Sequence, residues 1–230
     1  WNDIPIVRML EERFGIRTGI HNDANACALA EWKFGAGVGT QNMVFLTFGT
    51  GLGAGLILDG KLYAGTNDNA GELGHIRLSE FGPVGYGKCG SFEGFASGGG
   101  IAQLARFKVS EKQQMGESVA WCPPGQLDSI SAHTVALAAA SGDPLALEIY
   151  RISATYLGRG LAMVIDLLNP EVIVIGSIYV RNRELMEPFV LQEIEREALS
   201  HARRVCSVRP AKLGEQIGDY AALSVAANLI

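Results

Sequence analysis

The stretch NMVFLTFGTGLGAGLILDGKLYAG, residues 42–65, contains the beginning of a sheet. Its first seven residues form an apolar run that predicts a buried strand. The glycine-rich residues 49–55 predict a turn, and the apolar residues 56–58 predict a second strand. Asp59 and Gly60 form a favoured two-residue hairpin turn, after which the chain returns as a third strand. The stretch therefore predicts antiparallel strands joined by two turns.

Helical and strand-like segments alternate on both sides of this stretch. Residues 4–14 and 24–35 have helical patterns, and residues 16–20 predict a short strand between them. Farther on, a helical pattern over residues 145–168 is followed by EVIVIG, residues 171–176, which is typical of a parallel strand buried on both faces. This alternation, together with the hairpin, predicts an α/β fold with a mixed sheet and flanking helices.

Composition narrows the class of protein. The chain has 230 residues, of which 48% are hydrophobic, and a formal net charge of −5. That is enough apolar sequence for a large core, whereas an acidic chain is a poor candidate for binding nucleic acid. No apolar run reaches the ~18–20 residues that span a bilayer, and no signal peptide is visible. The four cysteines lie far apart without a CxxC pair, which predicts free thiols in the cytoplasm.

The segment HNDANA, residues 21–26, is a candidate catalytic site. The predicted strand would deliver Asn22 and Asp23 to the beginning of the next helix. A carboxylate there can accept a proton from a substrate hydroxyl, and the neighbouring amide can orient the same substrate. The alternative is that Asp23 only caps the helix.

A candidate phosphate site is the segment TFGTGLGAG, residues 47–55. Glycines without Cβ atoms allow backbone N–H groups to close around phosphate oxygens, and Thr50 adds a hydroxyl donor. The segment lacks the GxxxxGK[ST] pattern, and no helix follows it. The alternative is therefore an ordinary glycine-rich β-turn.

Two further segments could bind a ligand. Glu72, His75 and Glu93 lie in a glycine-rich loop, and such side chains can hydrogen-bond the vicinal hydroxyls of a sugar. The alternative for this loop is a solvated glycine loop. Gly176 and Ser177 follow a buried strand, at the end where open α/β sheets bind ligands. An ordinary turn from strand to helix is the alternative there.

Together, these segments resemble the ROK family of repressors, open reading frames and sugar kinases. The resemblance runs from about residue 1 to the C-terminus and is carried, in order, by HNDANACALAE, LTFGTGLGAGLILDGKLYAG, AGELGHI, GSFEGFASG, LLNPEVIVIGS and GEQIGDYAALSVAA. It implies the actin/hexokinase-like, or ribonuclease H-like, ATPase fold with its active site in a cleft between two domains. Residues 1–40 are then expected to be a remnant of the small N-terminal domain, and residues 41–230 the large domain.

The resemblance also implies roles for the candidate residues. The family's kinases move the γ-phosphoryl group of ATP, with Mg²⁺, to a sugar hydroxyl, and Asp23 would be the general base on that hydroxyl. The sugar would be held by Asn22, Glu72, His75 and Glu93. The nucleotide would be held by Gly49, Thr50, Gly51, Gly53, Gly176 and Ser177. The substrate would be a hexose or an N-acetylhexosamine, and the protein a homodimer or tetramer.

The glycine-rich loop departs from the zinc-binding pattern of the family. Zinc-containing members carry GH…CxCGxxGCxE, a histidine and three cysteines. Aligned on Glu93, the three cysteine positions fall on Val84, Tyr86 and Ser91, and Cys89 falls on a position that is not a ligand. We therefore expect no zinc. Instead, we expect the loop to be ordered by apolar packing of Val84, Tyr86 and Phe92.

The 230 residues also contain no DxGxT-type phosphate loop, which the family carries on its first strand. We therefore expect a fragment that lacks much of the small domain and binds ATP poorly by itself. Three functions stay open: a sugar kinase, a sugar-responsive repressor with a helix-turn-helix outside this chain, and a binding protein that keeps the sugar pocket without catalysis. Residues upstream of this chain would discriminate among them.

Overall fold

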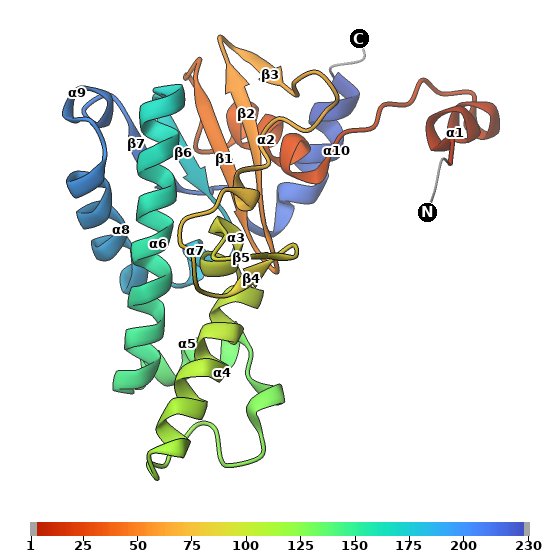
Figure 1. The fold of residues 1–230 in the computed structure, drawn as a ribbon. Coiled ribbons are helices and arrows are strands. Elements are labelled where there is room, and N and C mark those ends of the chain that lie inside the picture. The colour runs from red at the N-terminus through yellow and green to blue at the C-terminus, as the bar shows by residue number, and fades with distance from the viewer. Residues whose placement is uncertain (1–3, 228–230) are drawn as a thin grey trace.

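The computed structural model describes residues 4–227, which fold around a five-stranded sheet (Figure 1). Its strands run in the order β3-β2-β1-β6-β7. They are β1 (Met43–Phe48), β2 (Leu52–Leu58), β3 (Lys61–Tyr63), β6 (Val172–Ile175) and β7 (Ser207–Pro210). The first three pair antiparallel, whereas β1, β6 and β7 pair parallel. The predicted mixed sheet is therefore confirmed.

Helices cover both faces of the sheet. The four covering helices are α2 (Asp23–Phe34), α6 (Pro144–Leu168), α8 (Arg183–Glu197) and α10 (Ile217–Ala227). Successive side chains of a strand point to opposite faces, so Val44 and Leu46 of β1 enter a large core with α6 and α8. Met43 and Phe45 enter a smaller core with α2. The central strands are therefore apolar on both sides.

The remaining elements extend from this sandwich. In Figure 1, α4 (Gly98–Gln114) and α5 (Ala132–Ala140) form an extension below the sheet. The shorter helices and strands are α1 (Ile6–Phe14), β4 (Val84–Gly85), β5 (Lys88–Cys89), α3 (Phe92–Phe95), α7 (Ile178–Arg181) and α9 (Ser200–Arg203). Three 3₁₀ turns are η1 (Leu73–His75), η2 (Leu127–Ser129) and η3 (Gly214–Gln216). Among the described residues, 4–227, no helix is both long and apolar enough to cross a membrane.

Helix α2 lies directly on β2 because β2 contains glycines. A Cβ atom on Gly55 would lie 2.6 Å from the carbonyl oxygen of Ala24 and 2.6 Å from the Cβ atom of Ala28. The prediction that residues 49–55 form one turn is therefore wrong. Strand β2 already begins at Leu52, and its glycines serve the close approach of a helix.

Two other predicted elements differ from the structure. Residues 16–20 form no strand, so Asn22 and Asp23 are delivered by an irregular segment. The pattern YAALSVAANLI, residues 220–230, predicts a last helix that Asp219 could cap. The helix begins at Ile217, which places Asp219 inside its first turn, and residues 228–230 lie outside the described part of the chain.

The two ends of the chain differ in how they pack. Helix α1 has no buried residue and stands clear of the sandwich in Figure 1. Helix α2, which the domain prediction also assigns to the small domain, packs against β1, β2 and α10. The boundary at residue 40 stays a prediction.

A buried carboxylate joins α2 to the segment that leads into α10. Glu31, which is fully buried, accepts hydrogen bonds from the backbone N–H groups of Ala36 at 2.7 Å, Lys212 at 2.9 Å and Leu213 at 2.9 Å. A buried carboxylate is costly unless such donors satisfy it. Glu31 therefore links chain segments that lie at opposite ends of the described sequence.

Candidate functional site

The turn between β1 and β2 is held by the beginning of α4. The N–H group of Gly98 donates to the carbonyl oxygen of Gly49 at 2.8 Å, and that of Gly99 donates to Thr50 at 3.1 Å. These are amides of the first helical turn, which have no partner inside the helix. Within the turn, Gly49 N–H donates to the carbonyl of Gly51 at 3.1 Å. The positive end of the α4 dipole is thus fixed beside Thr50, where it favours a negative ligand.

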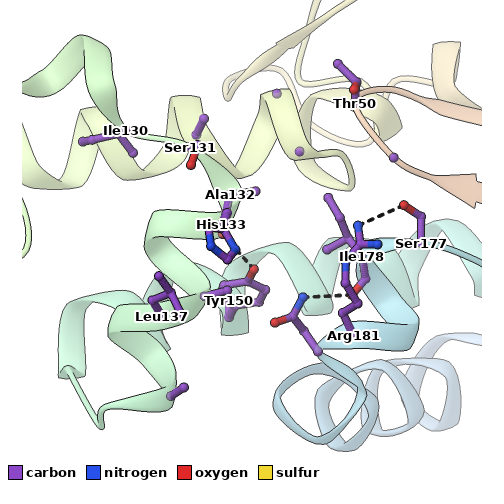
Figure 2. A pocket seen from close by; sticks show the side chains of 17 residues that line it. Thr50, Ile130, Ser131, Ala132, His133, Leu137, Tyr150, Ser177, Ile178 and Arg181 are labelled. Carbon is purple, nitrogen blue, oxygen red and sulfur yellow. Dashed lines mark hydrogen bonds between the residues drawn. The ribbon is translucent and has the colours of Figure 1, made fainter.

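A cavity of about 830 Å³ opens at this turn (Figure 2). One wall comes from the turn and α4, a second from the apolar side of α5, and a third from the end of β6 with α7. The residues that line it include Gly49, Thr50, Gly99, Leu137, Ser177 and Arg181. Its volume and largely apolar wall are typical of a small-molecule or cofactor site.

Ser177 is placed as predicted, at the carboxyl end of a central strand. Its φ of +57° lies in the left-handed region, which is unusual for a residue other than glycine. Arg181 donates a hydrogen bond from Nη2 to Ser177 Oγ at 3.2 Å. A Cβ atom on Gly49 would lie 3.9 Å from that Oγ atom. The structure therefore brings the predicted Gly49, Thr50 and Ser177 together around one cavity.

Two other predicted nucleotide residues have backbone roles. Gly53 lies inside β2, where a Cβ atom would be 3.3 Å from that of Ala24. Gly176 extends the pairing of β6 by donating its N–H group to the carbonyl oxygen of Leu46 at 2.9 Å. Both positions are therefore explained by packing and pairing.

Glu93 lies against the other end of the turn. Its Oε2 atom accepts a hydrogen bond from the Leu52 N–H group at 3.0 Å. A Cβ atom on Gly51 would be 2.7 Å from the same oxygen, and one on Gly74 would be 3.3 Å from the Glu93 Cβ atom. The two glycines therefore leave room for the Glu93 carboxylate. The Leu52 N–H group bonds to only one of its two oxygens.

Glu72 and His75 flank Gly74 in the segment of η1, and both side chains are exposed. Gly74 itself is buried and lies against the carbonyl oxygen of Leu52. The turn η1 thus crosses the beginning of β2, close to Glu93. These three predicted sugar residues therefore gather at the same end of β2.

Asn22 and Asp23 begin helix α2. Asn22 is the N-cap, since its Oδ1 atom accepts a hydrogen bond from the Ala24 N–H group at 2.9 Å. Asp23 Oδ1 accepts from the same N–H group at 2.8 Å. The two side chains share one donor, so Asn22 can still cap the helix when the exposed carboxylate of Asp23 binds another partner. The Cβ of Ala24 lies over Gly53, which seats the beginning of α2 on β2 near the turn.

Polar contacts order the glycine-rich loop. Phe92 is fully buried as expected, but Val84 is 46% exposed and Tyr86 is 89% exposed, so their predicted apolar packing is wrong. Gln103 of α4 donates to the Val84 carbonyl at 2.8 Å and accepts from the Val84 N–H group at 2.9 Å. Cys89 Sγ donates to the carbonyl of Gly82 at 3.2 Å. Hydrogen bonds to the backbone thus order the exposed part of this loop, while Phe92 joins its end to the core.

The metal prediction concerns the same loop. Across residues 4–227, no group of three or more His, Cys, Asp or Glu side chains could hold a metal ion. The expected absence of zinc stays a prediction that elemental analysis must test.

Burial raises the pKa of two side chains near the site and so favours their neutral forms. It raises the pKa of Tyr150, in the cavity wall, to about 12, and the hydroxyl donates to the Ala132 carbonyl at 3.2 Å. Burial, followed by the negative charges of Asp23 and Glu31, raises the pKa of the Cys27 thiol to about 11. Both groups therefore stay neutral at physiological pH.

Several residues of the cavity were missed by sequence reasoning. Gly98 and Gly99 had a signal, because Ser97 followed by three glycines precedes a helical pattern. Ser97 Oγ indeed caps α4 by accepting from the Gly100 N–H group at 2.9 Å. Arg181 and Tyr150 had none, since they reach the cavity only through the packing of α5, α6 and α7.

Comparisons with known proteins agree with this architecture. The model of the ROK family matches residues 1–228. The glucokinase of Streptomyces coelicolor is 32% identical over 228 residues, which cover 98% of this chain and 72% of that protein.

Solved structures include both classes of relative. A ROK family glucokinase from Streptomyces griseus, in complex with glucose and AMPPNP, has a TM-score of 0.81 at 31% identity, covering 99% of this chain and 74% of that one. A ROK family transcriptional regulator, a homologue of the E. coli MLC protein, has a TM-score of 0.83 at 31% identity, covering 97% and 55%. With a family match over nearly its whole length and these structural neighbours, the chain belongs to the ROK family and has its actin/hexokinase-like α/β fold.

Proposed function

We propose that this chain belongs to an ATP-dependent sugar kinase, which transfers the γ-phosphoryl group of ATP to a hydroxyl of a hexose or an N-acetylhexosamine. The observation that carries the proposal is the β1–β2 turn. Gly49 and Thr50 line the large cavity, whereas the adjacent Gly51 and Leu52 contact Glu93. A phosphoryl donor and a sugar on the two ends of one turn would be neighbours, as phosphoryl transfer requires.

The cavity suits a nucleotide. The apolar side chains of α5 offer a surface for the base, and Thr50 lies beside the positive end of the α4 dipole, where phosphates would be stabilised. Mg²⁺ bound with ATP would neutralise charge on the phosphates. The glucokinase of S. griseus, which shares this fold, was solved with AMPPNP and glucose.

Asp23 is the proposed general base. As the sugar hydroxyl attacks the γ-phosphorus, its proton passes to the Asp23 carboxylate, a bond forms between the sugar oxygen and phosphorus, and the bond to the ADP oxygen breaks. Asn22, Glu72, His75 and Glu93 would orient the sugar through hydrogen bonds to its other hydroxyls. Glu93 can use its Oε1 atom for the sugar, because the Leu52 N–H group donates to Oε2.

The setting of this reaction is also proposed. None of the four cysteines forms a disulfide, which agrees with a cytoplasmic protein. We further propose a homodimer or tetramer that binds no nucleic acid through this chain.

An ADP-coupled assay over hexoses and N-acetylhexosamines tests the function, with the natural gene product that contains these residues. The expected result is ADP formation that depends on one sugar or a few related ones. Sugar binding measured by calorimetry without turnover on any bound sugar would contradict the kinase proposal.

A sugar-responsive repressor is the second candidate, and the regulator with a TM-score of 0.83 favours it. A repressor would need the side chains proposed to bind sugar, but it would not need Asp23 as a general base. Sugar-dependent release of the natural gene product from DNA, without ADP formation, would support it over the kinase.

A further inference from the structure

The hairpin of β4 and β5 carries an unusual residue at its tip. Val84 pairs with Cys89 and Gly85 with Lys88, which leaves Tyr86 and Gly87 as a two-residue turn. Both have positive φ, 44° for Tyr86 and 75° for Gly87. Such turns favour asparagine, aspartate or glycine at the first position, because most other residues are strained at positive φ. The conformation of the turn therefore does not explain why a tyrosine is found at this position.

Packing into the core does not explain the tyrosine either, since Tyr86 is 89% exposed. Its ring instead meets the imidazole of His75 edge-on, with ring centroids 6.1 Å apart and an interplanar angle of 79°. This is a favourable geometry for two aromatic rings. The strained residue thus places its ring against one of the proposed sugar ligands.

A second contact joins the same hairpin to the same residue. Lys88 donates a hydrogen bond from Nζ to the carbonyl oxygen of His75 at 2.8 Å. The hairpin can hold His75 firmly because its own base is fixed by the paired hydrogen bonds of Gln103 to Val84. His75 is therefore held through its ring by Tyr86 and through its backbone by Lys88.

We propose that Tyr86 and Lys88 are positioning residues that orient His75 for sugar binding. The inference rests on the proposed function, because that function assigns His75 to the sugar. An exposed histidine on a short 3₁₀ turn would otherwise sample several rotamers and lose that freedom when the sugar binds. Restricting the ring beforehand strengthens sugar binding without touching the phosphoryl transfer itself.

Tyr86→Ala tests the proposal in the natural gene product, with Tyr86→Phe as the conservative variant. Phe81→Ala is the matched control, since Phe81 is an aromatic residue of the same loop that is 83% exposed. Tyr86→Ala should weaken sugar binding roughly threefold to tenfold, while kcat and the KM for ATP stay within about twofold. Tyr86→Phe and Phe81→Ala should resemble the wild type. Lys88→Met should weaken sugar binding in the same direction.

Nuclear magnetic resonance gives a readout that does not depend on activity. The His75 imidazole protons, assigned with a His75→Gln variant, should shift in Tyr86→Ala because the ring current of Tyr86 is lost. They should keep their positions in Phe81→Ala. Tyr86→Gly serves as a second variant, because glycine adopts the same backbone conformation without strain and preserves the turn.

Each outcome decides the proposal. Wild-type sugar affinity in Tyr86→Ala and Tyr86→Gly, or unchanged His75 resonances, would overturn it. A wild type that binds sugar without making ADP would refute the kinase but leave the affinity comparison decisive for Tyr86. A wild type that binds none of the sugars would overturn both.

Discussion

The carboxylate of Glu93 in α3 accepts the backbone N–H group of Leu52, 41 residues earlier in the chain, at 3.0 Å. This bond fixes a proposed sugar ligand to the turn whose preceding residues line the nucleotide-sized cavity. The proposed sugar site and the nucleotide-sized cavity therefore both depend on the β1–β2 turn. A change in Glu93 is expected to affect both the stability of the turn and the binding of sugar.

Replacing Glu93 separates these two effects. Glu93→Ala leaves the Leu52 N–H group without its partner and should lower the free energy of unfolding by about 1–3 kcal/mol. Glu93→Gln keeps an oxygen acceptor and should be less destabilising. Glu72→Ala is the matched control, since the exposed Glu72 should alter stability by no more than ~0.5 kcal/mol. Chemical denaturation reports stability, and calorimetry should show weaker sugar binding in the alanine variants.

Asp23→Asn should reduce the rate of phosphoryl transfer about 10²–10⁴-fold while leaving sugar binding largely intact. Asparagine can still hydrogen-bond the sugar hydroxyl but cannot accept its proton. The helix should not suffer, because Asn22 provides the cap. Asp219→Asn, the same change in the first turn of α10, is the control. Turnover near that of the wild type in Asp23→Asn would refute the assignment of the base.

Gly55→Ala should destabilise the fold by about 1–3 kcal/mol, because the added methyl group would collide with α2. Gly218→Ala is the contrasting change. No atom lies within 4 Å of its would-be Cβ, and Gly218 is helical, so alanine there should stabilise by about 0.4–1 kcal/mol. Thermal unfolding of both variants checks the pair. Equal melting temperatures would show that α2 does not rest on β2 as described.

The raised pKa of Cys27 predicts that the stability of the fold decreases at alkaline pH. Its thiol pKa is raised to about 11 in the fold, from an ordinary value of 9.0. The folded state therefore holds this proton more tightly, and the resulting stability is complete below about pH 9 and lost as pH rises toward 11. The melting temperature of the wild type should fall more steeply over this interval than that of Cys27→Ala. Parallel curves would contradict the shift.

The purified natural gene product should contain no stoichiometric zinc. Three of the four positions expected to bind zinc are Val84, Tyr86 and Ser91, none of which supplies a thiolate. Elemental analysis measures the content, and a chelator should leave the melting temperature unchanged. One zinc ion per chain would show that the loop binds metal by a different set of side chains.

Local patterns predicted the sheet well. The hairpin turn at Asp59 and Gly60 was predictable because both residues adopt positive φ, which their chemistry favours. Gly53 and Gly55 were misassigned to a turn, since a glycine that admits a neighbouring helix has the same local pattern as one that bends the chain. The difference lies in Ala24 and Ala28, which sequence reading alone does not bring near them.

The candidate site shows the same limit. Glu93, Thr50 and Ser177 were named from the sequence, and the structure places Thr50 and Ser177 around one cavity. The exposure of Tyr86 was not predictable, because an aromatic residue in a short loop is ordinarily expected to pack. Its position depends on a distant bond between Gln103 and Val84, which local patterns cannot indicate.

The buried carboxylate of Glu31 has a consequence for how the protein is made. Its donors Lys212 and Leu213 lie 181 and 182 residues downstream. At translation rates of about 5–20 residues per second, they follow Glu31 from the ribosome by roughly ten to thirty-five seconds. Throughout that interval the Glu31 carboxylate lacks these two donors, so its burial is only partly compensated. The helix that carries Asp23 can already pack on β1 and β2, but its buried carboxylate is satisfied only after Lys212 and Leu213 have been synthesised.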